Sequence, residues 1–219
     1  MKIGTDGVLL GAWTSIKHNP FAILDIGAGT GILSLIMAQR TDAEVIEAIE
    51  IDDNAYEQCA NNFENSPWSD RLFCYHASLL EFANEVDDQY DSIICNPPFY
   101  SEDYKTENTS RDLARFQDAM PFEHLVFAAK KFLSKDGVFS VVIPFKEEIY
   151  FEELAAKVGL FAVRKLHVRG HKDADIKRSL IEFSFTKTAL KTSELIIENG
   201  RHNYTEDYIN IVKDFYLNM

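Results

Sequence analysis

The tetrapeptide Asn96-Pro97-Pro98-Phe99 forms a rigid corner that carries groups able to do chemistry. Both prolines lack an amide hydrogen and have a restricted φ, and Pro97 favours an extended backbone at Asn96. The apolar run 91–95 that precedes the corner is typical of a buried strand. The chain therefore holds a side-chain amide, a prolyl carbonyl and an aromatic ring at one place with little freedom.

These three groups suit a planar substrate with an exocyclic amino group. The Asn96 side-chain oxygen and the Pro97 carbonyl oxygen can each accept one amino hydrogen. Such bonds direct the nitrogen lone pair at an electrophile, and Phe99 can stack on the substrate ring. A plain proline-proline turn after a buried strand is the alternative interpretation, which the tetrapeptide alone does not exclude.

A glycine-rich turn earlier in the chain predicts a nucleoside site. An apolar run over 21–26 is typical of a central parallel strand, and it leads through 27–31 (Gly-Ala-Gly-Thr-Gly) into an apolar helix over 32–40. Glycines at such a turn let the backbone approach a ligand closely. A dinucleotide fingerprint would need glycine at Ile32, so this pattern fits a dinucleotide poorly.

Two more polar residues fall where the next predicted strands end. Glu50 closes a strand over 44–50, and Ser78 follows a strand over 72–76. Ligands of open parallel sheets lie at the carboxyl ends of the strands, where an acid after the second strand binds a ribose diol. Ile51 can cover an adenine face and Ser78 can reach the base. A surface carboxylate is the alternative for Glu50, but the order of the strands favours a nucleoside-bearing cofactor.

The remaining pattern alternates strands with helices, which predicts a doubly wound, mainly parallel α/β sheet in one domain over 1–219. Further helices are expected over 53–63, 121–133 and 146–158 and after a Thr205 cap, and further strands over 138–143, 160–168 and 179–186. Residues 100–119 are polar and without apolar periodicity, and a stretch this long is usually either functional or disordered. Its cations are expected to grip the substrate: Lys105, Arg111 and Arg115.

Composition and charge exclude several classes of protein. The chain has 219 residues, 46% of them hydrophobic, with neither a membrane-length apolar run nor a signal peptide, so we expect a cytoplasmic globular protein that needs no membrane. Three widely spaced cysteines indicate reduced thiols rather than a disulfide or a zinc site. His167 and His171 have no partner cysteine, so no metal is expected.

The net charge of -13 argues against binding of a polyanion by the whole surface. The segment 164–178 is the exception, because it contains six basic and only two acidic residues. Four of its cations are the candidates for contacts with RNA phosphates: Arg164, Lys165, Arg169 and Lys172. A solvated hairpin explains the same segment equally well.

The order of motifs resembles the S-adenosylmethionine-dependent methyltransferases of the Rossmann-like class I over nearly the whole chain. The resemblance implies a seven-stranded sheet with helices on both faces. It implies catalytic roles for Asn96, Pro97 and Phe99. It also implies a cofactor site made of Thr5, Asp6, Asp25, Gly27, Gly29, Gly31, Glu50, Ile51, Ser78 and Asn96.

Within this class the chain is similar to a bacterial family that methylates N6 of the adenosine immediately 3′ of the anticodon in a valine tRNA. The motifs that carry this similarity are 2–7 (Lys-Ile-Gly-Thr-Asp-Gly), 39–41, 66–68, 111–115 and the ending 203–217. The resemblance implies a tRNA anticodon loop as the partner and no obligate protein partner. Family members carry a segment before the first motif, so we expect that extension to be missing, and they tend to have Asp where this chain has Ser78.

Two other functions remain open at this level. A methyltransferase with another amino acceptor fits the same corner, whether guanosine N2 or adenosine N6 of ribosomal RNA or a protein glutamine amide. A catalytically silent cofactor-binding module that interacts with RNA is the alternative from a different class.

Overall fold

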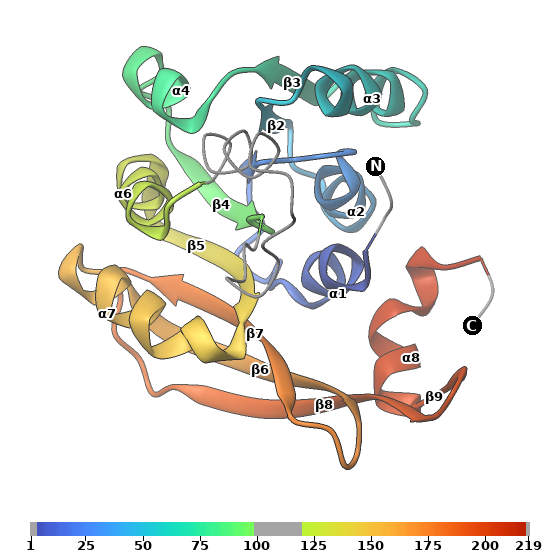
Figure 1. The fold of residues 1–219 in the computed structure, drawn as a ribbon. Helices are drawn as coiled ribbons and strands as arrows, with labels where there is room; N and C mark the ends of the chain where they lie inside the picture. Colours follow the sequence, from blue (N-terminus) through green and yellow to red (C-terminus); the bar gives the residue numbers. More distant parts are fainter. Residues whose placement is uncertain (1–3, 99–119, 218–219) are drawn as a thin grey trace, which may run out of the picture.

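The computed structural model describes residues 4–98 and 120–217, and these residues form an α/β fold around one large sheet (Figure 1). The strands are β1 (Ala22–Ile26), β2 (Val45–Glu50), β3 (Leu72–His76), β4 (Tyr90–Cys95), β5 (Leu133–Pro144), β6 (Phe161–His171), β7 (Ile176–Ser184), β8 (Lys191–Gly200) and β9 (Asn203–Tyr204). The helices are α1 (Thr5–Trp13), α2 (Ile32–Arg40), α3 (Asp53–Glu64), α4 (Leu79–Glu85), α6 (Phe122–Phe132), α7 (Glu148–Lys157) and α8 (Glu206–Val212), with short 3-10 turns η1 (Phe145–Glu147) and η2 (Lys213–Phe215).

The strand order is β3-β2-β1-β4-β5-β7-β6-β8-β9. Strands β1 to β5 pair in parallel, whereas β7 is antiparallel to both β5 and β6. The chain order reverses across β1 and β4, so this pair of strands forms the switch point at which open α/β sheets bind ligands.

Helices cover both faces of the sheet and bury two separate cores, which confirms the doubly wound prediction. One core lies under α1, α2, α3 and α8 and includes Leu10, Met37 and Phe63. The other lies under α4, α6 and α7 and includes Phe132, Phe139 and Phe151. Figure 1 shows the two groups of helices on opposite sides of the strands. Within the described ranges, no helix is long and apolar enough to cross a lipid bilayer.

The described part of the sheet has nine strands rather than the predicted seven. The two unexpected strands are β8 and β9, which lie at one edge of the sheet. In β8 only Leu195 is buried, because most of its residues face solvent. An exposed edge strand lacks the continuous apolar run that revealed the central strands, and this is why the sequence did not predict it.

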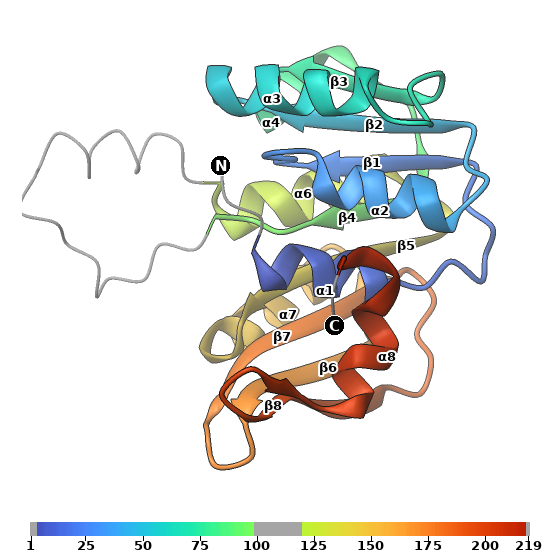
Figure 2. The same ribbon diagram turned by 90° about the vertical axis from the view of Figure 1, so that its right-hand side faces the viewer.

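The register places the carboxyl ends of the first four strands next to one another. Ile26 pairs with Cys95, and Glu50 pairs with His76. Figure 2 shows β1, β2 and β4 running side by side toward these carboxyl ends. The residues after these strands therefore meet in space although they are up to about 70 positions apart in the chain.

Candidate active site

The glycine turn after β1 adopts a backbone that only glycine accommodates easily. Gly27, Gly29 and Gly31 have φ values of 72°, 58° and 77°. At Gly31 a Cβ atom would also lie 2.5 Å from Phe63 Cε1 and 2.8 Å from Cys59 Sγ. The turn is thus packed tightly against α3 from behind, and the N-terminus of α2 is fixed in place directly after it.

Glu50 connects the end of β2 to this turn. Its Oε2 accepts a hydrogen bond from Gly29 N at 2.7 Å, and its Oε1 accepts hydrogen bonds from the amides of Ile51 and Asp52, both at 2.9 Å. The carboxylate is buried, and these three amides satisfy part of its acceptor capacity. Glu50 therefore holds the glycine turn and the β2–α3 loop together at the place where the sequence predicted a ribose-binding acid.

Ile51 directly follows β2, and Ser78 lies two residues after β3. Ile51 is 46% exposed, which is unusual for an isoleucine and leaves an apolar face next to Glu50. Ser78 is the N-cap of α4, because its Oγ accepts a hydrogen bond from Glu81 N while Glu81 Oε2 accepts one from Ser78 N. The structure therefore gives Ser78 a capping role that the prediction of a cofactor contact did not include.

Asp25 lies inside the sheet rather than at the surface of the site. Its Oδ2 accepts hydrogen bonds from Ser34 N at 3.1 Å and Ser34 Oγ at 2.8 Å, which ties β1 to the first turn of α2. Its Oδ1 is buried and has no partner among the described residues. Burial raises the pKa of Asp25 to about 7, although the hydrogen bonds from Ser34 act in the opposite direction.

The raised pKa of Asp25 predicts a pH-dependent stability. In the folded protein the Asp25 carboxyl stays protonated up to a pH of about 7, whereas its ordinary pKa is 3.8. The free energy of unfolding therefore contains a contribution that is fully present below the lower value and is lost as pH rises through the higher one. Urea unfolding of the wild type and Asp25→Asn at pH 5 and pH 8 measures this contribution. We expect the stability of the wild type relative to the variant to fall between these two pH values, whereas parallel changes would contradict the assignment.

Asn96 and Pro97 follow β4 directly, with Asn96 partly exposed and Pro97 buried. A Cβ atom at Gly7 would lie 3.8 Å from Asn96 Nδ2 and 3.4 Å from Ile32 Cγ2. Three segments thus converge on Asn96: the first turns of α1 and α2 and the end of β4. Phe99, the third predicted catalytic residue, lies outside the described residues.

Thr5 and Asp6 begin α1 on the same side of the sheet. The N-cap of this helix is Gly4, so Thr5 and Asp6 both lie in its first turn. Asp6 Oδ2 accepts a hydrogen bond from Arg178 Nε at 2.7 Å. This ion pair joins α1 to β7, so the Asp6 carboxylate has a structural partner in addition to the predicted cofactor role.

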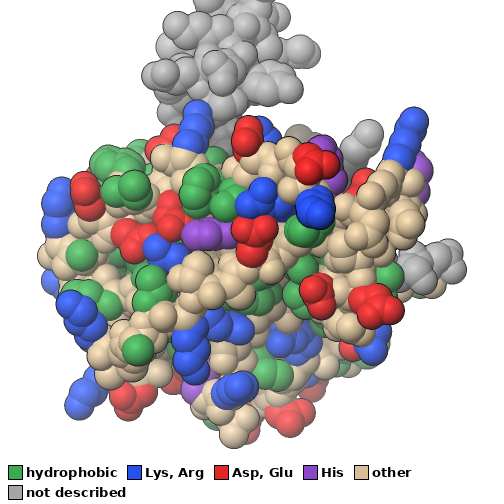
Figure 3. Space-filling model, turned by 90° about the horizontal axis from the view of Figure 1, so that it is seen from below, with side chains coloured by type: hydrophobic (Ala, Val, Ile, Leu, Met, Phe, Trp, Pro, Cys, Tyr) green, Lys and Arg blue, Asp and Glu red, His purple; other side chains and the backbone are tan. Residues whose placement is uncertain are grey.

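The cations of segment 164–178 do not form the free basic patch that was expected. Lys165 is only 9% exposed in its side chain, and its ammonium contacts Glu148 at 2.8 Å and also Glu152. Burial acts to lower the pKa of Lys165, but the bonds to these two carboxylates outweigh it and raise the pKa. Arg169 donates a hydrogen bond to Glu194 at 2.9 Å. Figure 3 shows basic and acidic side chains interspersed over this face.

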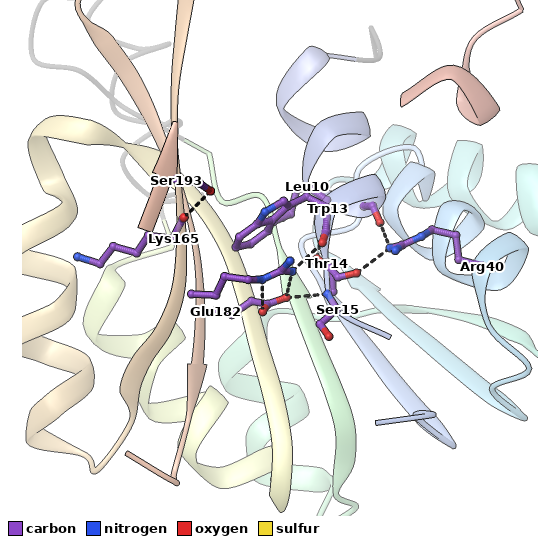
Figure 4. A network of polar contacts seen from close by, with 10 residues as sticks. Leu10, Trp13, Thr14, Ser15, Arg40, Lys165, Glu182 and Ser193 are labelled. Atoms are coloured by element: carbon purple, nitrogen blue, oxygen red, sulfur yellow. Dashed lines mark hydrogen bonds and ion pairs between the residues drawn. The ribbon is translucent and has the colours of Figure 1, made fainter. Parts of the chain in front are cut away.

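Arg164 belongs to a network that anchors the end of α1. Its Nε and Nη2 donate hydrogen bonds to Glu182 at 2.7 and 2.6 Å, and Nη2 also donates to Trp13 O at 2.7 Å. The guanidinium lies 3.9 Å from the centre of the Trp13 ring, and Glu182 also accepts a hydrogen bond from Ser15 N. Figure 4 shows Trp13, Ser15 and Glu182 in this network. Arg164 and Lys165 therefore have structural partners in addition to the predicted role in RNA binding.

Lys172 differs from these three cations. It is exposed in the turn between β6 and β7. The described residues thus leave Lys172 as a candidate RNA contact, whereas Lys105, Arg111 and Arg115 lie outside them.

The arrangement at the sheet edge fits a nucleoside cofactor. Glu50 has acceptor capacity beyond its three amides, Ile51 presents an apolar face beside it, and the glycines of the turn have no side chains that would keep a ligand away from the backbone. Glu50 would hold the ribose and Ile51 would cover the base. Together with Asn96, they lie at the carboxyl ends of four adjacent strands.

Solved structures share this fold. The chain matches a predicted O-methyltransferase from Agrobacterium tumefaciens with a TM-score of 0.68 at 18% identity, over 95% of this chain and 96% of that one. It matches a putative RNA methyltransferase from Pyrococcus horikoshii with a TM-score of 0.55 at 20% identity, over 74% of this chain and 72% of that one. The fold is that of the class I methyltransferases.

Sequence relatives make the assignment more specific. Residues 8–165 match the model of the methyltransferase small domain, and the chain belongs to this family. It is 58% identical to the tRNA1(Val) (adenine(37)-N6)-methyltransferase of Flavobacterium psychrophilum, over all of this chain and 94% of the relative. It is 53% identical to the enzyme of the same name from Christiangramia forsetii, over all of this chain and 92% of the relative. The chain is a methyltransferase, and S-adenosylmethionine is its methyl donor.

Proposed function

We propose that this enzyme transfers a methyl group to N6 of adenosine 37, next to the anticodon of a valine tRNA. The observation that carries the substrate is the identity of 53 to 58% to enzymes named for this reaction, over the whole of this chain. The observation that carries the chemistry is the convergence of Asn96, Gly7 and the glycine turn at one edge of the sheet. Because the substrate is a tRNA, we place the reaction in the cytoplasm.

The cofactor residues in this proposal are Glu50 for the ribose, Ile51 for the adenine and the turn 27–31 for the methionine part. When bound, S-adenosylmethionine supplies an electrophilic methyl group. Asn96 Oδ1 and the Pro97 carbonyl accept the two amino hydrogens of the target adenine, which orients the nitrogen lone pair. Phe99 stacks on the base. The amine loses a proton readily once it is methylated, so no strong general base is needed.

The anticodon loop suits this mechanism because its bases are single-stranded. Turning an unpaired adenosine into a pocket costs less free energy than extracting a paired one. Lys172 on the β6–β7 turn is a candidate for a phosphate contact, together with Lys105, Arg111 and Arg115. Replacing Lys172 with alanine tests this part: it should weaken tRNA binding and reduce its salt dependence without changing cofactor affinity.

The decisive experiment supplies labelled S-adenosylmethionine with unmodified valine tRNA, followed by nucleoside mass spectrometry. We expect N6-methyladenosine from the anticodon loop, and no label in a matched tRNA whose adenosine 37 is replaced by guanosine. If valine tRNA takes up no label but ribosomal RNA or a protein glutamine supplied in a parallel reaction does, the chemistry holds and the substrate is rejected. Binding of tRNA and cofactor without transfer to any acceptor would reject an enzymatic role.

A further inference from the structure

We propose that His76 positions the adenosine-binding loop, although it makes no contact with the reacting atoms. This inference rests on the proposed roles of Glu50 and Ile51 in cofactor binding. His76 is the last residue of β3, directly opposite Glu50 in the parallel register. Neither the glycine pattern nor the strand-end acid pointed to this histidine.

The contacts of the His76 ring converge on the β2–α3 loop. Nε2 lies 3.0 Å from Ile51 O and 3.2 Å from Asp53 Oδ1. Both neighbours are acceptors, so Nε2 carries the hydrogen and donates it to them. The ring also stacks on Tyr56 of α3, with 5.0 Å between the ring centres and 23° between the planes. The His76 side chain thus contacts the Ile51 carbonyl, the Asp53 carboxylate and the Tyr56 ring.

The other hydrogen bonds described for this loop engage its amides rather than the Ile51 carbonyl. Glu50 holds the amides of Ile51 and Asp52, and Asp52 caps α3 through Ala55 N at 2.8 Å. The side chain of Ile51, by contrast, is about half exposed. The hydrogen bond from His76 to Ile51 O sets the orientation of the peptide that carries this side chain, and with it the apolar face offered to the adenine.

The exposure of His76 separates this role from a general contribution to stability. The side chain is 42% exposed, so its removal leaves no buried cavity or unpaired buried charge. The loss should therefore be local to the loop. We expect His76→Ala to weaken binding of S-adenosylhomocysteine by about five- to tenfold, the worth of about one hydrogen bond. The KM for S-adenosylmethionine should rise similarly with kcat nearly unchanged.

Two variants make this test specific. His76→Gln retains an N–H donor and should bind within about twofold of the wild type, the range left by a retained hydrogen bond. His18→Ala is the matched control, because Nε2 of His18 also lies 3.1 Å from a backbone carbonyl. That carbonyl belongs to Asp91, near the amino-terminal end of β4 and away from the candidate site. This variant should leave cofactor affinity unchanged.

The readout is calorimetric titration of each variant with S-adenosylhomocysteine, which needs neither tRNA nor turnover. Unchanged affinity of His76→Ala, or an equal loss in His18→Ala, would overturn the positioning role. A wild type that binds S-adenosylhomocysteine but methylates no valine tRNA would reject the proposed substrate and leave this test valid. A wild type that does not bind it would overturn this inference along with the cofactor site.

Discussion

Replacing Asn96 with alanine is expected to lower kcat by more than about 100-fold, the size of effect seen when one catalytic hydrogen-bonding group is removed. Alanine cannot accept an amino hydrogen, so the target nitrogen loses the group that orients its lone pair. The side chain is partly exposed at the end of β4, so the variant should fold normally. Single-turnover methyl transfer to valine tRNA measures the effect.

Cofactor affinity distinguishes this role from a structural one. Titration of Asn96→Ala with S-adenosylhomocysteine should give an affinity close to that of the wild type. Asn199→Ala changes an exposed asparagine on β8 and serves as the matched control, with normal activity expected. An equal loss of turnover and cofactor binding in Asn96→Ala would count against a catalytic role and in favour of a role in cofactor binding.

Replacing Arg164 with leucine is expected to lower the free energy of unfolding by about 3 kcal/mol, because it strands a buried carboxylate. Glu182 is buried, and Arg164 supplies two of its hydrogen bonds; among the described residues, the bond from Ser15 N is the one that would remain. The variant also loses the contact with the Trp13 ring and with Trp13 O. Urea unfolding followed by circular dichroism measures the loss.

A second arginine on the same strand provides the control. Arg169→Leu breaks the pair with Glu194, which is more exposed, and should cost less than about 1 kcal/mol. Salt-dependent tRNA binding, measured under conditions where both variants are folded, tests the alternative. If the Arg164→Leu protein is stable and its tRNA binding is weaker and less salt-dependent, the result would support the prediction that Arg164 contacts RNA.

Local patterns in the sequence predict the elements whose burial and periodicity leave a direct trace in contiguous residues. The apolar run before the glycine turn became β1, and the strand predicted over 72–76 has those bounds in β3. Thr205 caps α8 as expected, with its Oγ1 accepting a hydrogen bond from Tyr208 N at 3.2 Å. These features depend on residues that are close in the chain, so the sequence displays them.

The charged residues show where that approach ends. A lysine in a basic segment is expected to be exposed, yet Lys165 is buried between Glu148 and Glu152 of α7. Arg164 pairs with Glu182 because β6 and β7 are antiparallel and place these two residues opposite each other. Counting charges along the chain cannot reveal partners that the strand register supplies.

By itself, then, the sequence determined the central strands, the glycine turn and the amide corner, because each is encoded by contiguous residues with a strong local preference. Only the tertiary structure decided which distant polar groups are engaged: Glu50 with Gly29 N, Asp6 with Arg178, and His76 with the Ile51 carbonyl. The physical reason is that a hydrogen bond or an ion pair depends on distance in space. Parallel strands bring together residues that the chain keeps far apart.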